Sequence, residues 1–349
     1  MVQNKKALID NHFVIIGNGT AGNTAAKVIR QKDKNSRITL ISSEPTPFLY
    51  RHNLVKFLTE DKNIYDYSVN PFEWYDELNI RLRLNQTVVG IESLKKEILF
   101  QHRERIQYDK LLICVGANHR VPEYLSHYIK FLSHFSNSID AISLKSRLDK
   151  VNHLVLIGGD CIGLQLAGAL SKLGKKITII MEEYQFWPLE FDVSTKNRLA
   201  SSLENKGFVV IRDDYVIFIE KHGSGLKIKT NNGNNIIADD AVLCSGMSPN
   251  LDFLLDSGID LNEGILVNEK LETNIKDIWA AGECAQIYYP EISDYRCSTG
   301  YVNALKQGEL AAKNMLGYDK SAELPKKGRV IISGEVFETY GWKGFSLDA

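Results

Sequence analysis

The sequence predicts an α/β protein built on parallel sheets, and two observations carry this prediction. Short runs of β-branched and other apolar residues alternate with amphipathic helical stretches along the chain, as in strand–helix–strand units. One such unit also occurs twice: a strand, a glycine-rich turn, a helix and a second strand begin near Phe13 and follow again from Leu154. The first glycines of the two turns, Gly17 and Gly158, are 141 residues apart.

The individual elements follow from these patterns. In the first copy, a strand at residues 13–16 leads into the turn, a helix over about residues 21–31 and a strand at residues 38–41. Asn70 and Pro71 are expected to be the N-cap and the first residue of a short helix that ends at Glu77, because proline fits the first helical position. A further strand is expected at residues 111–115. The second copy has strands at residues 154–157 and 177–180, with a helix to about Leu173 between them.

The composition excludes several classes of protein. The 349 residues are 44% hydrophobic and 24% charged, which is ordinary for a globular chain of about two domains. Lys and Arg number 42 against 43 Asp and Glu, so nothing favours binding to nucleic acid or to an anionic membrane. No apolar run approaches the ~18 residues of a membrane span, and the polar first ten residues do not resemble a secretory signal. We therefore expect a soluble, cytoplasmic protein.

The cysteines and histidines indicate neither a redox disulfide nor a metal site. The five cysteines are scattered and include no CxxC pair, so a disulfide framework, a zinc knuckle and a dithiol centre all lack support. Each cysteine is read as a small buried apolar residue. The eight histidines show no HExxH pattern, and we predict no metal site.

The first glycine turn has the pattern of a dinucleotide-binding loop. Gly17, Gly19 and Gly22 form GxGxxG between an apolar strand and a helix, and Glu44 follows Gly22 by 22 residues, at the end of the second strand. In such a loop the first glycine permits the tight turn and the second lets the backbone approach a pyrophosphate. The third lets the helix pack on the strand, and the carboxylate accepts hydrogen bonds from ribose hydroxyls. The alternative is a glycine turn with a surface glutamate.

Together with this loop, four further stretches resemble the FAD-dependent pyridine nucleotide–disulfide oxidoreductase superfamily. Within it, the sequence is most similar to the branch without a redox disulfide, which contains rubredoxin, ferredoxin and nitrite reductase-type flavoproteins. The stretches lie in the order of that family at residues 108–116 (YDKLLICVG), 239–250 (DDAVLCSGMSPN), 273–285 (TNIKDIWAAGECA) and 301–308 (YVNALKQG). The resemblance covers about residues 11–317.

This resemblance implies an FAD site and two residues beside the flavin. Lys56 and Gln165 match the flavin-proximal positions, although the family usually has a glutamate at the second. Arg51 matches an arginine that meets the FAD phosphates; Arg51 and Lys56 could instead be solvated surface cations. Ser298 or Thr299 would cap the helix that faces the flavin. The implied FAD-binding residues are Gly17, Gly19, Thr20, Ala21, Gly22, Glu44, Arg51, Lys56, Val88, Gly116, Gly282, Glu283 and Thr299.

The second glycine turn matches the NAD(P) position of the family but departs from its pattern. Asp160 stands where the middle glycine belongs, although backbone must come close to a doubly charged pyrophosphate there. We expect its carboxylate to cap its own helix and to weaken NADH binding. No arginine cluster favours a 2′-phosphate, so NADH is preferred over NADPH. The implied NAD(P)-binding residues are Gly158, Gly159, Asp160, Cys161, Ile162, Gly163, Glu182 and Gly246.

The resemblance also implies two Rossmann-like domains, with the NAD(P)-type domain inserted into the FAD domain. The expected segments are residues 1–118 and 256–318 for the FAD domain, 119–255 for the inserted domain, and 319–349 for a short C-terminal extension with one or two strands at residues 329–337. The favoured function is an FAD-dependent NAD(P)H oxidoreductase that passes electrons to a small carrier protein such as rubredoxin or ferredoxin. An FAD-holding electron-transfer subunit without NAD(P)H binding, and a non-enzymatic flavoprotein that serves as an interaction module, remain alternatives. The oligomeric state is left open.

Overall fold

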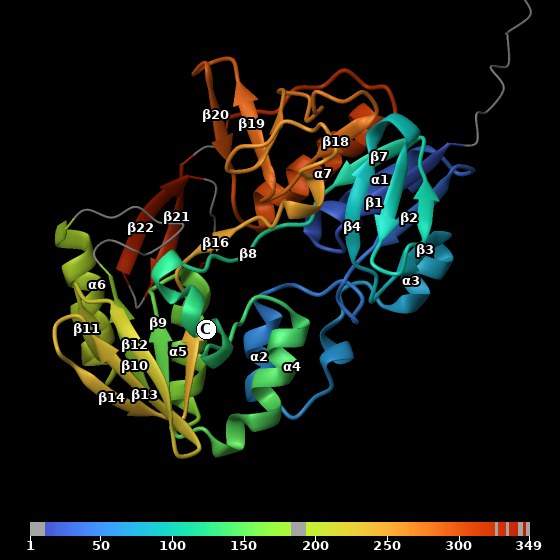
Figure 1. Cartoon of the computed structure of the whole chain (residues 1–349). Helices are drawn as coiled ribbons and strands as arrows, with labels where there is room; N and C mark the ends of the chain where they lie inside the picture. Colours follow the sequence, from blue (N-terminus) through green and yellow to red (C-terminus); the bar gives the residue numbers. More distant parts are fainter. Residues whose placement is uncertain (1–10, 183–192, 325–326, 333–334, 341–344, 347–349) are drawn as a thin grey trace, which may run out of the picture. The chain divides into compact units, whose positions relative to one another are not determined.

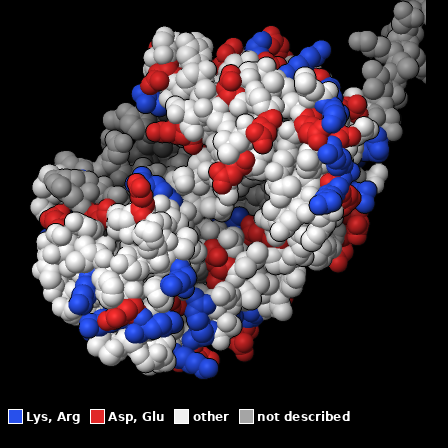
Figure 2. Space-filling model, viewed as in Figure 1, with Lys and Arg blue, Asp and Glu red and all other residues white. Residues whose placement is uncertain are grey.

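A computed structural model describes residues 11–182, 193–324, 327–332, 335–340 and 345–346 (Figure 1). The chain divides into two compact units. The first consists of the described residues of Met1–Leu49, Ser68–Ala117 and Pro249–Lys326. The second consists of those of Tyr50–Tyr67, Asn118–Ser248 and Lys327–Ala349. On the face drawn in Figure 2, basic and acidic side chains are intermixed, in keeping with a net charge of −1.

The first unit is built on a five-stranded parallel sheet in the order β18-β7-β1-β2-β3. Its strands are β1 (His12–Ile16), β2 (Arg37–Ile41), β3 (Ile80–Arg83), β7 (Lys110–Ile113) and β18 (Ile278–Ala280). Its α-helices are α1 (Thr20–Lys32), α3 (Phe72–Glu77) and α7 (Tyr301–Met315). Two small sheets complete it: β4 (Val88–Glu92), β5 (Glu97–Phe100) and β6 (Arg105–Gln107), and β17 (Ile265–Val267), β19 (Ala285–Tyr289) and β20 (Asp294–Cys297).

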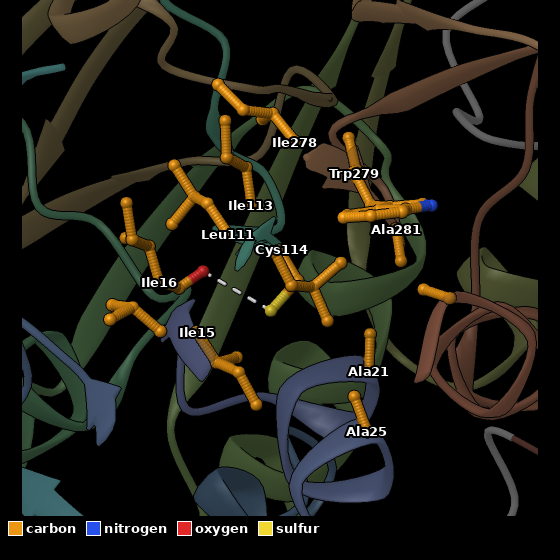
Figure 3. Packing of buried hydrophobic residues seen from close by; sticks show 14 of the residues in the cluster. Ile15, Ile16, Ala21, Ala25, Leu111, Ile113, Cys114, Ile278, Trp279 and Ala281 are labelled. Carbon is orange, nitrogen blue, oxygen red and sulfur yellow. Dashed lines mark hydrogen bonds between the residues drawn. The ribbon is translucent and has the colours of Figure 1, made fainter. Parts of the chain in front are cut away.

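The core of the first unit lies between this sheet and helices α1 and α7. Figure 3 shows Ile15 and Ile113 from neighbouring strands beside Cys114, whose thiol donates to the carbonyl oxygen of Ile16 at 3.2 Å. Helices α1 and α7 pack against each other. A Cβ atom on Gly308 would lie 2.3 Å from the carbonyl oxygen of Ala21, so this close approach of the two helices requires glycine at that position.

The second unit repeats the plan on a four-stranded parallel sheet in the order β11-β10-β9-β15. Its strands are β9 (His153–Ile157), β10 (Lys176–Met181), β11 (Val209–Arg212) and β15 (Asp240–Leu243), and its helices are α2 (Asn53–Thr59), α4 (Ser138–Arg147), α5 (Cys161–Lys172) and α6 (Val193–Asn205). An antiparallel sheet contains β12 (Val216–His222), β13 (Gly225–Thr230) and β14 (Asn235–Ala238), and β8 (Asn118–His119) pairs with β16 (Met247–Ser248). Strands β21 (Lys327–Ile332), β22 (Glu335–Tyr340) and β23 (Phe345–Ser346) form a third small sheet.

Short 3₁₀ segments connect these elements. They are η1 (Ile64–Tyr67), η2 (Ser93–Lys95), η3 (Glu123–Phe131), η4 (Leu148–Lys150) and η5 (Asp252–Leu254). No α-helix among the described residues has the length and apolarity needed to cross a membrane. The same residues contain no cluster of three or more His, Cys, Asp or Glu arranged to hold a metal ion.

The predicted fold class, α/β with parallel sheets, is confirmed, and one local expectation is wrong. Pro71, rather than Asn70, is the N-cap of α3, because the side-chain amide of Asn70 donates instead to Asn23 Oδ1 at 3.0 Å. The stretch Tyr50–Tyr67, which the sequence assigns to the first FAD segment, belongs to the second unit. There α2 packs against α4 and α5, and Lys145 Nζ donates to the carbonyl oxygens of Phe57 and Glu60, each at 2.7 Å.

Candidate functional site

The two glycine turns have the same backbone geometry. Gly17 donates its N–H to the carbonyl oxygen of Ile41, and Gly158 donates to that of Ile180, both at 2.8 Å. Their φ angles are +120° and +104°, and an added Cβ atom would lie 2.1 Å and 2.2 Å from the carbonyl oxygens of Cys114 and Cys244, respectively. Both positions therefore require glycine.

The matched geometry extends to side chains outside the glycine pattern. His12 Nε2 is 2.8 Å from Thr39 Oγ1 in the first unit, and His153 Nε2 is 2.9 Å from Thr178 Oγ1 in the second. Asp109 Oδ2 accepts the backbone N–H of His12 at 2.6 Å, just as Asp239 Oδ2 accepts that of His153 at 2.9 Å. The two units are thus copies of one design, including its hydrogen bonds at the start of the first strand.

The predicted residues of the first unit follow the carboxyl ends of adjacent parallel strands. Gly17 follows β1, Glu44 follows β2, Gly116 follows β7 and Gly282 follows β18. Because these strands are parallel neighbours, the four positions lie along one edge of the sheet, where open α/β sheets bind their ligands. Val88, the first residue of β4, is half-buried in the separate antiparallel sheet.

The N-terminus of α1 is open at this edge. Gly19 is the N-cap, no side chain caps the helix, and Thr20 and Ala21 are its first two residues. An added Cβ atom on Gly19 would have no neighbour within 4 Å, whereas one on Gly22 would lie 2.0 Å from the carbonyl oxygen of Gly17. The helix is therefore held tightly to the turn at Gly22 and leaves space at Gly19, so these residues fit a dinucleotide pyrophosphate.

A polar network that the sequence analysis missed holds this turn through Asn18. The Tyr75 hydroxyl donates to Asn23 Oδ1 at 2.7 Å or to Asn18 Oδ1 at 3.1 Å, and Asn23 Nδ2 donates to Asn18 Oδ1 at 2.8 Å. Asn18 Nδ2 reaches the carbonyl oxygen of Thr46 at 3.2 Å. Burial raises the pKa of Tyr75, so its hydroxyl keeps its proton. The one signal of this network in the turn itself is Asn18, at its second position.

The N-terminus of α7 is tied to the residues after β18. Gln307 Oε1 accepts the N–H of Gly282 at 2.6 Å, and Glu283 Oε1 accepts the N–H of Gly300 at 3.1 Å. The carboxylate of Glu283 is therefore fixed at the beginning of the helix. The acidic charge lies where the partial positive charge of a helix N-terminus stabilises it.

The expected cap of α7 is wrong. Neither Ser298 nor Thr299 caps this helix, because it begins at Tyr301 with Gly300 as an N-cap that has no side-chain hydrogen bond. The carbonyl oxygen of Thr299 instead accepts the side-chain amide of Asn303 at 2.7 Å. Glu283 supplies the acceptor at this helix end that Ser298 or Thr299 was expected to provide.

The second turn differs from the first where the middle glycine would stand. Asp160 is the N-cap of α5 and accepts the N–H of Gly163 on Oδ1 at 2.8 Å, which confirms the expected self-capping. Oδ2 accepts the N–H of Gly246 at 3.2 Å and lies 4.0 Å from His119 Nδ1. Both side chains are 2% exposed. Burial raises the pKa of Asp160, and the neighbouring His119 and the backbone N–H groups oppose that shift.

The remaining predicted residues of the second unit lie on three elements. Arg51 lies just before α2 and Lys56 lies within it, and both are exposed. Gln165 is half-buried on α5, the helix against which α2 packs. Glu182 follows β10, and burial raises the pKa of its carboxyl while the charge of Arg120 lowers it. Arg120 was not singled out in the sequence, because it is far from the motifs. The predicted roles of these side chains beside a flavin or a nucleotide stay predictions.

The five cysteines are free thiols, and four of them are buried. Burial raises the pKa of Cys114, Cys161, Cys244 and Cys284, in the last case to about 12. Cys297 is exposed at the surface, and partial desolvation together with the charge of Glu263 raises its pKa to about 11. Thiols in this state are poor nucleophiles at neutral pH.

Comparisons with known proteins agree with this geometry. The family model described as "Pyridine nucleotide-disulphide oxidoreductase" matches residues 11–308. The chain is 32% identical over 319 residues to the NADH-rubredoxin oxidoreductase of Clostridium acetobutylicum, covering 88% of this chain and 76% of that protein. It is 30% identical over 336 residues to the nitrite reductase (NAD(P)H) of Bacillus subtilis, covering 93% of this chain but only 40% of that relative. A ferredoxin reductase from Rhodopseudomonas palustris shares the fold, with a TM-score of 0.83, 21% identity and coverage of 91% of this chain and 79% of that one.

Proposed function

Since this chain belongs to the pyridine nucleotide-disulphide oxidoreductase family, we propose that it is an FAD-dependent NAD(P)H oxidoreductase that delivers electrons to a small carrier protein. The observation that carries the proposal is the edge of the first sheet, where Gly17, Glu44, Gly116 and Gly282 follow adjacent parallel strands beside the uncapped N-terminus of α1. Bound FAD would accept two electrons from a nicotinamide and release them one at a time.

The chain's own residues divide the work of holding this cofactor. The open backbone at Gly19 and the first turn of α1 would bind the pyrophosphate, and Glu44 would accept hydrogen bonds from the ribose hydroxyls. The network of Tyr75, Asn18 and Asn23 holds the turn in place. Gly282, Glu283 and the start of α7 would supply the remaining contacts.

The names of the relatives support the donor and the class of acceptor. One is an NADH-rubredoxin oxidoreductase, and another is a rubredoxin-NAD(+) reductase of Pseudomonas putida, 26% identical over 334 residues. The second unit, a copy of the first, is the candidate for NADH, with NADH preferred over NADPH. The buried thiols with raised pKa values favour a flavin that works without a cysteine pair. We place this reaction in the cytoplasm, where NADH is available.

Anaerobic titration of the purified protein with NADH tests the proposal. We expect one non-covalent FAD per chain after acid release, loss of the yellow absorbance on adding NADH, and its return on adding oxidised rubredoxin or ferredoxin. A preparation that holds no FAD would contradict the proposal. An FAD that is bleached by dithionite but not by NADH would support the second candidate function, an electron-transfer subunit without NAD(P)H binding, which the buried carboxylate of Asp160 at the second turn favours. A flavin that neither NADH nor a carrier protein changes would point to the non-enzymatic interaction module.

A further inference from the structure

We propose that Asp160 is an internal competitor for the phosphate-binding position at the N-terminus of α5, and that its charge keeps the affinity of the second unit for NADH low. This inference rests on the proposed function, because it concerns the site at which the hydride donor would bind. It assigns to one residue the control of nucleotide affinity.

The first step is that the carboxylate occupies the helix end itself. In a dinucleotide-binding unit, the pyrophosphate lies at the N-terminus of the first helix and accepts its free N–H groups. In α5 the Oδ1 atom of Asp160 accepts the N–H of Gly163 at 2.8 Å, and Oδ2 accepts the N–H of Gly246 at 3.2 Å. The protein's own anion thus uses a helix donor, the N–H of Gly163, that a phosphate would otherwise use.

The second step is that this side chain is ionised. His119 Nε2 accepts the backbone N–H of Phe135 at 3.0 Å, so the proton of the neutral ring is on Nδ1, which is buried without a hydrogen-bond partner and lies 4.0 Å from Asp160 Oδ2. Every polar group recorded around the two oxygens in the described residues is therefore a donor. A protonated carboxyl would need an acceptor, so these surroundings favour the carboxylate.

The third step is that the charge is held in place. The side chain is 2% exposed, so water screens it weakly, and the cap bond to Gly163 fixes its position. The neighbouring thiols of Cys161 and Cys244 remain protonated, because burial and the charge of Asp160 both raise their pKa. A pyrophosphate brought to this helix end would meet a like charge at short range or would have to bind away from it.

Three variants separate charge from helix stability. Asp160→Asn keeps an oxygen that can accept the N–H of Gly163 but removes the charge. Asp160→Gly restores the pattern of the first turn, and glycine is itself a tolerable N-cap. Asn137→Gly is the matched control, because Asn137 is the N-cap of α4 in the same unit and accepts the N–H of Asp140 at 2.9 Å.

The probes are ADP-ribose, which carries the pyrophosphate but transfers no hydride, and adenosine, which carries no phosphate. Isothermal titration of the FAD-loaded protein gives both dissociation constants, and anaerobic stopped-flow reduction gives the concentration of NADH that half-saturates the rate. We expect both Asp160 variants to bind ADP-ribose and NADH at least tenfold more tightly than the wild type. Adenosine binding in these variants, and all binding in Asn137→Gly, should remain within twofold of the wild type.

The outcomes distinguish this inference from the proposed function. Equal binding of ADP-ribose by the wild type and both Asp160 variants would overturn the inference. If NADH still reduced the flavin rapidly in that case, the proposed function would stand. If adenosine gained as much affinity as ADP-ribose, the effect would be one of space rather than charge, and the inference would also fail. A wild type that binds no dinucleotide, together with an Asp160→Gly variant that does, would support the inference and would show that the wild-type chain receives its electrons elsewhere.

Discussion

The first and second glycine turns share their backbone and differ where a phosphate would bind. Gly17 and Gly158 make the same hydrogen bond at the same distance and need glycine for the same reason. The helix after the first turn has Gly19 as its N-cap, and no side chain caps it. The helix after the second turn is capped by the carboxylate of Asp160. The backbone that the two turns share therefore does not distinguish a unit that binds an anion from one that does not; on the inference above, the residue at the helix end makes that difference.

Placing an aspartate at the first turn, as in the second, should have the largest effect on FAD binding. Gly19→Asp would place a carboxylate at the open N-terminus of α1, and two like charges ~4 Å apart at an effective dielectric of about 20 repel by roughly 4 kcal/mol. Half of that corresponds to a roughly 30-fold weaker binding of FAD, so the protein should be purified largely as the apoprotein. The measurement is FAD released by acid per chain, and the dissociation constant from titration of apoprotein with FAD. Gly19→Asn, of equal size without the charge, should lose much less; similar losses in both variants would show that volume, not charge, matters at Gly19.

The ribose position should give the next largest effect. Glu44→Ala removes a charged hydrogen-bond acceptor, and such a bond contributes about 1.5–3 kcal/mol, so FAD should bind at least tenfold more weakly. Glu182→Ala removes a carboxyl from the second unit and should leave FAD affinity unchanged. Both dissociation constants come from quenching of FAD fluorescence on titration with apoprotein. Full retention of FAD affinity by Glu44→Ala would remove this residue from the site.

Loss of the polar network of Tyr75, Asn18 and Asn23 should have a smaller effect on the affinity for FAD. The positions in the second turn that correspond to Asn18 and Asn23 are Gly159 and Leu164, which offer no polar side chain, so this support is particular to the first unit. Tyr75→Phe leaves the two asparagines without the buried hydroxyl, at a cost of about 1–3 kcal/mol, and should lower both urea stability and FAD affinity.

Tyr108→Phe is the control for that prediction. Tyr108 is also buried in the first unit, but its hydroxyl has no hydrogen-bond partner, so its removal should cost little. Equal destabilisation by the two substitutions would mean that the Tyr75 hydroxyl does not hold the turn. Equal FAD affinity in wild type and Tyr75→Phe would separate the network from cofactor binding while leaving its structural role intact.

The sequence predicted the parts of the molecule that depend on local backbone requirements. The glycines predicted both turns: Gly17 and Gly158 have a positive φ, and in the first turn Gly22 lies too close to Gly17 for any side chain. Self-capping by Asp160 was also predictable, because a short carboxylate side chain before a helix reaches the free N–H groups of its first turn. The approach of Gly22 to Gly17 and the bond of Asp160 to Gly163 each involve groups that are close in sequence.

The parts that were missed depend on partners far away in the sequence. The cap expected at Ser298 or Thr299 was wrong because Glu283 accepts the N–H of Gly300 instead. A long-range contact of the same kind holds α2, where Lys145 Nζ donates to the carbonyl oxygens of Phe57 and Glu60. Neither the amphipathic pattern nor the spacing of motifs records such a partner.

The smallest expected effect is on the pH dependence of stability, and it concerns His12 and His153, which occupy equivalent positions in the two units. Burial lowers the pKa of both His12 and His153 from the usual value of 6.5, so the neutral ring is favoured in the folded protein. The unfolded chain then binds more protons than the folded chain as the pH falls below about 6.5. The stabilisation from each ring is therefore complete above that pH and is lost as the pH falls through the lowered folded value.

Urea unfolding at a series of pH values between neutral and mildly acidic conditions measures this loss. His12→Gln and His153→Gln should each flatten the pH dependence, and by similar amounts, because each ring contacts a threonine at nearly the same distance. His52 and His134, whose pKa values are also lowered by partial desolvation, should leave a residual slope in both variants. If one variant removed the slope and the other left it unchanged, the two units would share their geometry but not the electrostatics of their first strands, and the likeness of the two copies would end at the backbone.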